Sequence, residues 1–238
     1  MLTIFAMLTM LIDHIGILLM PPLSGAIDET FMCRAIGRLA MPIFAYKIAN
    51  GFIHTRNFKK YFGRMTMLTI VSQVPFALMM SQVITGVADI DLLFDLNRYP
   101  HIFSSLNIGW TFMCALLVLY IINIPSNLIA VYIFKFIALF IVMCFAPVGD
   151  YGVYGVATVV VFYMAIKRGL SFPMTVFLFI AITFGFNSRS ETFYLLLQMI
   201  SVLSVFLVAL IPDTRSKYDK FIFYAFYPIH MIILLYLV

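Results

Sequence analysis

Residues 2–20 read LTIFAMLTMLIDHIGILLM, an apolar run with Asp13 and His14 in its second half. A helix that crosses a bilayer needs roughly 17–25 predominantly apolar residues, so this run has the length of a membrane span. Similar runs recur along the chain, which is 64% hydrophobic and 11% charged with a mean hydropathy of +1.08. Soluble domains are nearer half apolar. The sequence therefore predicts an all-α fold, a polytopic integral membrane helix bundle.

About nine transmembrane helices can be drawn at this span length. Their approximate bounds are 2–20, 32–53, 65–84, 103–122, 128–146, 152–166, 172–187, 193–211 and 221–238. Few residues remain between them, so we expect a single transmembrane domain over 1–238 and no cleavable signal peptide before the first span. The sixth and seventh spans are short, and the alternative is an eight-span protein with one broken hairpin over 152–187.

Basic residues between the spans predict the orientation. Successive loops lie on alternate sides of the membrane. The loops on one side carry nine basic residues: Arg56, Lys59, Lys60, Arg64, Lys167, Arg168, Arg215, Lys217 and Lys220. The loops on the other side carry two, Arg98 and Arg189. Lys and Arg accumulate on the cytoplasmic side of membrane proteins. We therefore predict a cytoplasmic N-terminus, and we attribute the basic pI to topology rather than to nucleic-acid binding.

Charged residues inside the spans are the main functional candidates, because a charge within the bilayer is costly. Asp13, His14 and Arg38 all lie about six or seven residues from the predicted external ends of the first two spans, so they share a depth. Arg34 and Arg38 are four residues apart and share a helix face. We predict an ion pair of Asp13 with one arginine and a surplus guanidinium that suits a phosphate or carboxylate. The alternative is a static pair that joins the helices.

His14 is the candidate for proton transfer, because imidazole titrates near neutral pH. Asp13 points about 100° away from it on a helix, so the two do not form a Ser-His-Asp-like dyad. His230 follows Tyr227 and Pro228 in the last span, where the proline frees a carbonyl and can kink the helix. The alternative role of both histidines is a hydrogen-bonded contact between packed helices.

Other polar candidates lie at span ends. His54, Arg56 and Lys60 belong to a basic patch that either anchors the topology or docks an anionic donor such as CoA or a lipid head group. Asn107 and Asp150 lie on the predicted external side, where they either cap helices or face a cavity. The three cysteines lack the spacing of metal ligands, so no metal is predicted.

Eight short motifs follow one another along the chain, and both their residues and their order are informative. They are LIDHIG (11–16), GRLAMPIFA (37–45), GFIHTRN (51–57), KY (60–61), SQVPF (72–76), LNI (106–108), DYGVYG (150–155) and KFIFYAFYPIH (220–230). Taken together they resemble the TraX family of conjugative pilus-assembly proteins over nearly the whole chain. Because the first span begins almost at Met1, we do not expect the longer polar N-terminal extension found in some members.

The resemblance implies a membrane-embedded acyltransferase that acetylates the N-terminus of a pilin in the inner membrane of Gram-negative bacteria. It also implies a distant similarity to membrane acyltransferases with an essential histidine in the first span. The expected partners are a pilin subunit, membrane lipids and other membrane proteins of the conjugation apparatus, with no nucleic acid. The candidate catalytic residues are Asp13, His14, Arg38 and His230, and the candidate substrate- or donor-binding residues are Arg34, His54, Arg56, Lys60, Asn107, Asp150 and Tyr227.

The sequence leaves the donor open between acetyl-CoA and a phospholipid. Acetyl-CoA is cytoplasmic, so its thioester arm would have to reach through the bundle to a site in the external half. A phospholipid of the external leaflet would meet that site directly, and the alternative function is transfer of a phosphoglyceryl or acyl unit onto pilin. A further alternative is a non-catalytic membrane chaperone for pilin. The absence of internal repeats disfavours a transporter.

Overall fold

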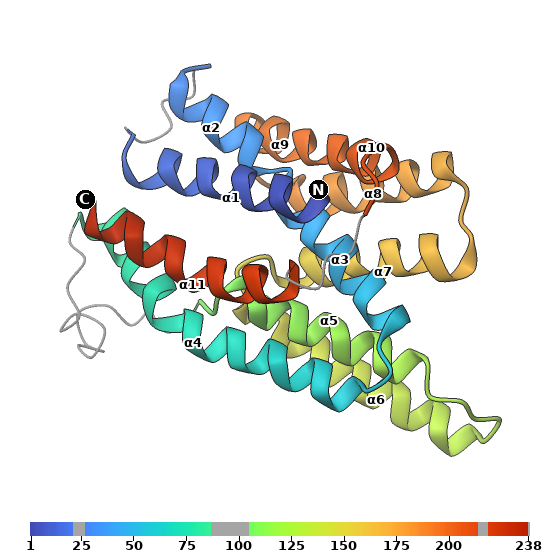
Figure 1. Cartoon of the computed structure of the whole chain (residues 1–238). Coiled ribbons are helices and arrows are strands. Elements are labelled where there is room, and N and C mark those ends of the chain that lie inside the picture. The colour runs from blue at the N-terminus through green and yellow to red at the C-terminus, as the bar shows by residue number, and fades with distance from the viewer. Residues whose placement is uncertain (21–26, 87–104, 214–218, 238) are drawn as a thin grey trace.

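The computed structural model describes residues 1–20, 27–86, 105–213 and 219–237. Over these residues the chain folds into a bundle of helices, most of which run roughly parallel or antiparallel to one another (Figure 1). Apart from an isolated bridge between Leu106 and Gly149, the described residues pair no strands. The predicted all-α membrane bundle is therefore confirmed.

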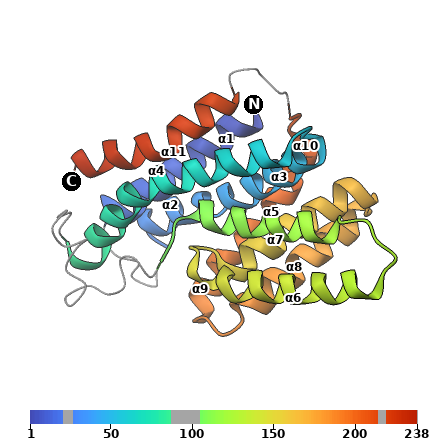
Figure 2. The same cartoon turned by 90° about the horizontal axis from the view of Figure 1, so that it is seen from below.

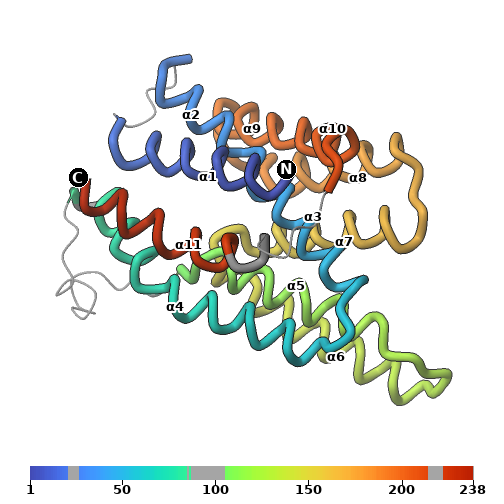
Figure 3. Tube along the Cα trace, in the orientation of Figure 1, coloured from blue at the N-terminus to red at the C-terminus, as the bar shows by residue number. Residues whose placement is uncertain are grey.

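Some successive helices join end to end, and we call each single helix or joined set a rod. In chain order the elements are α1 (Leu2–Leu18), α2 (Glu29–Gly37), α3 (Ala40–His54), α4 (Phe58–Thr85), α5 (Ile108–Ile122), α6 (Ile129–Phe145), η2 (Ala146–Val148), α7 (Gly152–Arg168), α8 (Phe172–Asn187), α9 (Thr192–Met199), η3 (Ile200–Val202), α10 (Leu203–Leu210) and α11 (Asp219–Tyr236). The trace passes from α2 into α3 without a loop (Figure 3), and η3 joins α9 to α10. The described helices thus form nine rods, the number of predicted spans.

Rod lengths agree only in part with the span lengths of the sequence. Among the residues that the structure describes, three helical stretches are long and apolar enough to cross a membrane, namely Phe58–Ile84, Ile129–Val148 and Thr192–Leu210. The same part of the chain contains four shorter apolar helices, Leu2–Leu18, Ile108–Ile122, Phe172–Asn187 and Ile222–Tyr236. The helix α4 begins at Phe58 rather than at the predicted residue 65, because the Asn57 side chain accepts a hydrogen bond from the Lys60 backbone N–H and caps it.

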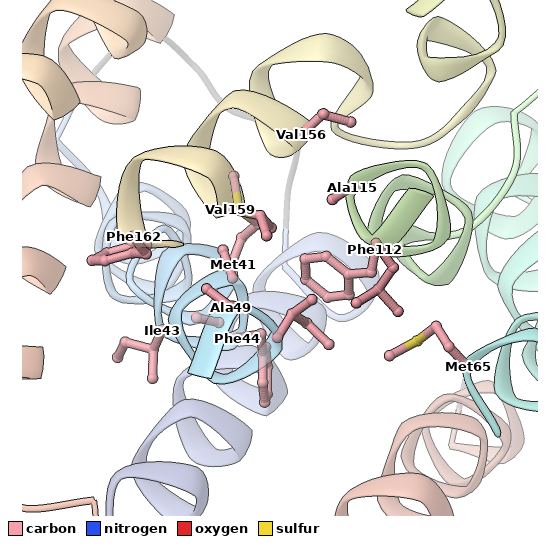
Figure 4. Close-up of a cluster of buried hydrophobic side chains, with 14 of the residues drawn as sticks. Met41, Ile43, Phe44, Ala49, Met65, Phe112, Ala115, Val156, Val159 and Phe162 are labelled. Carbon is pink, nitrogen blue, oxygen red and sulfur yellow. The ribbon is translucent and has the colours of Figure 1, made fainter. Parts of the chain in front are cut away.

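The core is centred on α3, which packs against α1, α5, α7 and α10. Figure 4 shows Met41 and Phe44 of α3 with Phe112 of α5 and Val159 of α7 in one buried cluster. The fully buried Ala49 on α3 has only a methyl group, which suits the close helix packing typical of membrane bundles. This packing holds the α2–α3 junction, and Arg38 within it, at a defined place in the bundle.

The helix α6 lies at the outer edge of the bundle beside α5 (Figure 2). None of its residues is buried, and most of its exposed side chains are large and apolar, as expected for a helix that faces lipid. Lys135 on this helix lies with its Nζ 5.4 Å from the centre of the Tyr132 ring, one turn towards the start of α6. The lysine therefore leans towards the helix end, as a snorkelling side chain does.

Candidate functional site

A cavity of about 760 Å³ opens at one end of the bundle. Its lining comes from the C-terminal ends of α1, α2, α4 and α8, the N-terminal end of α7 and the helix α9. The polar lining residues are Asp13, His14, Arg34, Arg38, Asp150, Tyr151, Tyr154, Asn187, Ser190, Glu191, Tyr194 and Gln198. The apolar lining residues are Ile17, Phe76, Met79, Met80, Val153 and Phe186. The four residues of the first two spans that the sequence marks as functional candidates, Asp13, His14, Arg34 and Arg38, all border this cavity.

Asp13 pairs with Arg34, with 2.8 Å between its Oδ1 and the arginine Nη1. This Oδ1 accepts no well-aligned hydrogen bond from the described residues, so the contact is an ion pair rather than a linear hydrogen bond. The two side chains are only 15% and 14% exposed, which limits solvent screening of the pair. The sequence left open which arginine faces Asp13, and the structure selects Arg34.

Glycines make this pairing possible by letting α1 and α2 approach closely. A Cβ on Gly37 would overlap the Asp13 side chain, and one on Gly16 would lie 2.6 Å from the Cys33 Cβ. Gly37 therefore provides the space in which the Asp13 carboxylate lies beside α2. In the sequence, Gly37, which provides this space, directly precedes Arg38, the second arginine of the cavity lining.

Arg38 is the cavity arginine that Asp13 does not pair with at close range. It lies at the junction of α2 and α3, near the Tyr151 hydroxyl and within electrostatic reach of Asp13 and Asp150. Its Nε is buried and has no hydrogen-bond partner in the described part of the chain. A guanidinium with an unused donor beside a cavity can bind a planar or tetrahedral anionic group.

The turn between α6 and α7 places Asp150 and Tyr151 at the cavity. The Leu106 N–H donates to Val148 O and the Asp150 N–H donates to Leu106 O, both at 2.8 Å, so the turn is held against the start of α5. A Cβ on Gly149 would lie 2.5 Å from Thr111 Oγ1, which explains why the turn needs glycine there.

Both side chains of this turn have perturbed acid–base properties. Asp150 lines the cavity, and the hydration that its carboxyl loses among the surrounding protein groups raises its pKa to about 6 against the opposing effect of Arg38. Burial likewise raises the pKa of the Tyr151 hydroxyl to about 12, although Arg38 nearby lowers it. At neutral pH Tyr151 is therefore a neutral hydrogen-bonding group beside Arg38.

The two intramembrane histidines meet although 216 positions separate them. His14 Nδ1 lies 2.7 Å from His230 Nε2, and His230 Nδ1 lies 2.8 Å from the Phe226 carbonyl oxygen. His14 borders the cavity, whereas His230 on α11 is 4% exposed and lies behind it. Pro228 lies inside α11, and the helix continues through it to Tyr236.

The predicted basic patch lies away from the cavity. His54 is the last residue of α3, sixteen positions after Arg38, which corresponds to about 24 Å of helix at about 1.5 Å per residue. His54, Arg56 and Lys60 are exposed, and none of them lines the cavity. With Lys59, Arg64, Lys167 and Arg168 they define what we call the basic end of the bundle.

Asn107 and Tyr227 are buried beside the site rather than in its lining. The Asn107 side chain accepts from the Gly109 N–H at 2.9 Å and caps α5, and its Nδ2 donates to Thr69 O at 2.8 Å on α4. It therefore joins α4 to α5. Tyr227 is 5% exposed, with its ring centre 5.9 Å from that of His230.

One wall of the cavity was not foreseen from the sequence. Tyr154 lies with its hydroxyl 3.2 Å from Thr183 Oγ1 and 3.3 Å from Ser201 Oγ, and it accepts from Gln198 Nε2 at 3.3 Å. This network joins α7, α8 and the α9–η3 rod under the cavity. The available signal was Gln198 itself, a polar side chain inside an apolar run.

A second polar cluster was also missed. The Lys47 ammonium donates to Asp213 Oδ1, and Asn50 Nδ2 donates to Asp213 Oδ2 at 3.1 Å. These contacts attach the segment after α10 to α3, away from the cavity lining. In the described ranges no group of three or more His, Cys, Asp or Glu side chains is placed to hold a metal ion.

Comparison with known proteins identifies related sequences. The family model described as "TraX protein" matches residues 1–238. Over 159 residues the chain is 27% identical to a Dichelobacter nodosus protein described as "Probable fimbrial assembly protein FimC, serogroup H1". That match covers 65% of this chain and 57% of the relative, so the chain spans less than two thirds of the relative's length. No solved structure matches the chain.

Proposed function

Because the chain belongs to the TraX family over its whole length, we propose that it is a membrane-embedded acyltransferase, of the N-acetyltransferase type, that modifies a pilin subunit during pilus biogenesis. A similar protein described as a probable fimbrial assembly protein supports the pilus context. The observation that carries the catalytic part is the placement of His14 and Arg38 on one cavity, with the Arg38 Nε unpartnered among the described residues. A base and an anion-stabilising group beside one space are the parts that acyl transfer needs.

The proposed reaction transfers the acyl group to the pilin amine, with His14 as the base and Arg38 as the group that stabilises negative charge. The amine nitrogen of the pilin attacks the carbonyl carbon of the acyl donor, and His14 accepts the proton that the nitrogen loses. Arg38 binds the oxygen on which negative charge develops. The new N–C bond forms as the bond from the carbonyl to the leaving sulfur or oxygen breaks, and the leaving group takes up a proton. Asp13 forms its close ion pair with Arg34, so the unpartnered Nε of Arg38 is the donor assigned to this oxygen.

The charge distribution supports an orientation for this reaction. The basic end carries most of the described Lys and Arg side chains outside the cavity, and the cavity opens at the opposite end. By the positive-inside rule, we place the basic end in the cytoplasm and the cavity on the external side of a bacterial inner membrane, crossed several times with a cytoplasmic N-terminus. Acetyl-CoA would then dock at the basic end and present its acyl group through the bundle.

The cavity position also favours a second candidate function. A phospholipid of the external leaflet can enter from the cavity end without crossing about 24 Å of protein. Arg38 suits the phosphate of such a lipid as well as it suits a carbonyl oxygen. The alternative is therefore transfer of a phospholipid-derived group, such as a phosphoglyceryl or acyl unit, onto the pilin.

Intact mass of the pilin tests the proposal. Pilin from cells with the wild-type protein should be heavier by one acetyl group than pilin from cells without it. The His14→Ala variant should lose the modification by roughly 10²–10⁴-fold in rate, because a methyl group cannot accept the proton. Lys135→Ala is the control, since Lys135 lies on the peripheral α6 outside the cavity lining.

The other outcomes separate the alternatives. A mass increase equal to a lipid fragment would favour the second function. Equal pilin masses with and without the protein would contradict both reactions and favour a chaperone. Membrane abundance of each variant, measured by immunoblot, distinguishes lost chemistry from lost protein.

A further inference from the structure

We propose that His230 is a positioning residue that fixes His14 in one tautomer, so that His14 Nε2 is the nitrogen that accepts the substrate proton. The inference rests on the proposed function for the identity of the reaction, but the tautomer itself is a property of the free protein. It follows from two hydrogen bonds, the planes of three rings and the place of each histidine relative to the cavity.

The Phe226 carbonyl determines the protonation of His230. A carbonyl oxygen accepts and never donates, so the 2.8 Å contact requires a proton on His230 Nδ1. A neutral His230 then has a bare lone pair on Nε2. The 2.7 Å contact between this Nε2 and His14 Nδ1 needs one proton between the nitrogens, and that proton must come from His14. His14 is therefore the Nδ1–H tautomer, and its Nε2 carries the free lone pair.

The ring geometry supports a strong hydrogen bond between the histidines. The two ring planes differ by only 9°, and the ring centres lie 4.9 Å apart. That separation is what results when the two contacting nitrogens lie in line between the ring centres, so the rings meet edge to edge. The lone pair of His230 Nε2 then points at the His14 N–H, which is the alignment in which hydrogen bonds are strongest.

The position of the pair directs the free nitrogen to the reactants. His14 borders the cavity and His230 does not, so the His14 edge opposite Nδ1 is the one available to a ligand. Nε2 is on that edge. Asp13, the sequence neighbour of His14, is engaged with Arg34, and the partner that orients the imidazole is thus a second imidazole.

The pair also has a way to hold the proton that it receives. When His14 Nε2 takes the proton, the added charge is shared through the hydrogen bond with His230 Nε2. The Phe226 ring lies over His230 with 4.6 Å between ring centres and 6° between planes. An aromatic face attracts a cation, so Phe226 stabilises the charged form of the pair. The proton returns from Nε2 to the leaving group, and the pair ends neutral.

Nitrogen-15 NMR of the histidine-labelled protein in lipid nanodiscs tests the tautomer without substrate. The expected spectrum has His14 protonated at Nδ1 and bare at Nε2, with a coupling across the hydrogen bond to His230 Nε2. Assignments come from His14→Gln and His230→Gln samples. A His14 that is protonated at Nε2 and bare at Nδ1 would overturn the proposal, because the cavity-side nitrogen could not then act as a base.

Rates of pilin modification in cells test the role of His230. His230→Leu should slow the reaction by roughly 10- to 100-fold, by analogy with the loss of a hydrogen-bond partner that orients a metal-ligating histidine. His230→Gln should recover part of the rate, because its amide oxygen can accept from His14 Nδ1–H. Ile233→Ala on the exposed face of α11 is the control.

A purely structural His230 would predict equal losses in both His230 variants, in proportion to protein abundance, and that result would overturn the positioning role. If the NMR tautomer is as expected but wild-type cells leave pilin unmodified, the assignment of the nitrogens stands and the proposed function fails. The two experiments therefore separate the inference from its premise.

Discussion

At the residue scale, Gly37 decides where the Asp13 carboxylate lies. A side chain at this position would occupy the space of Asp13, whose pairing with Arg34 depends on it. Without that pairing Arg34 would lose its close carboxylate partner at the cavity. A glycine that shows no unusual backbone angle thus controls the electrostatics of the site.

We predict that Gly37→Ala destabilises the protein by about 1–3 kcal/mol, the usual cost of overpacking, and reduces pilin modification. Thermal unfolding in detergent and the intact mass of pilin measure the two effects. Gly63→Ala is the matched control, because a Cβ there meets nothing within 4 Å and alanine favours the helix α4. Equal behaviour of the two variants would show that the close approach at Gly37 has no consequence.

At the element scale, the polar cluster of Lys47, Asn50 and Asp213 attaches the end of α10 to α3. The Lys47 and Asp213 side chains are 22% and 12% exposed, so the ion pair is largely shielded from solvent. Removing one partner of such a pair leaves an uncompensated charge, which costs more than the pair itself contributes.

We predict that Asp213→Ala lowers stability by about 1–3 kcal/mol, below the range for a completely buried pair because some solvent reaches it. Lys47→Met should also destabilise, and the double variant should lose less than the sum of the single losses, since the two residues are in contact. Thermal unfolding of the four proteins gives the coupling. Additive losses would mean that the ion pair contributes nothing to holding α10 on α3.

At the scale of the whole molecule, charge is segregated between the two ends of the bundle. The basic end and the cavity end are joined by rods whose exposed surfaces are largely apolar. The proposed orientation puts the cavity on the external side, where a pilin emerging from the membrane would meet it.

We predict that Ser188→Cys, in the turn after α8, reacts with a membrane-impermeant maleimide added outside spheroplasts. Ser171→Cys, at the exposed N-cap of α8 after the turn from α7, should react only after the membrane is opened. Both variants are made after replacing Cys33, Cys114 and Cys144. The opposite labelling pattern would place the cavity in the cytoplasm, and cytoplasmic acetyl-CoA would then reach it directly.

The helical class, the number of rods and the matching level of Asp13, His14 and Arg38 along the first two spans could all be predicted from the amino-acid sequence alone. These features depend on local quantities: the length of an apolar run, the need of a buried backbone to satisfy its own hydrogen bonds, and the rise per residue of a helix. Each can be evaluated within one span or one pair of adjacent spans.

The contacts between side chains of different helices became known only from the folded structure. It paired His14 with His230 across 216 positions, chose Arg34 over Arg38 for Asp13, and brought the turn at Asp150 against Leu106. Such contacts depend on how each helix is rotated about its axis and how closely its neighbours approach. That rotation is set by packing at small residues such as Gly37, where two segments meet, and no single segment contains the information.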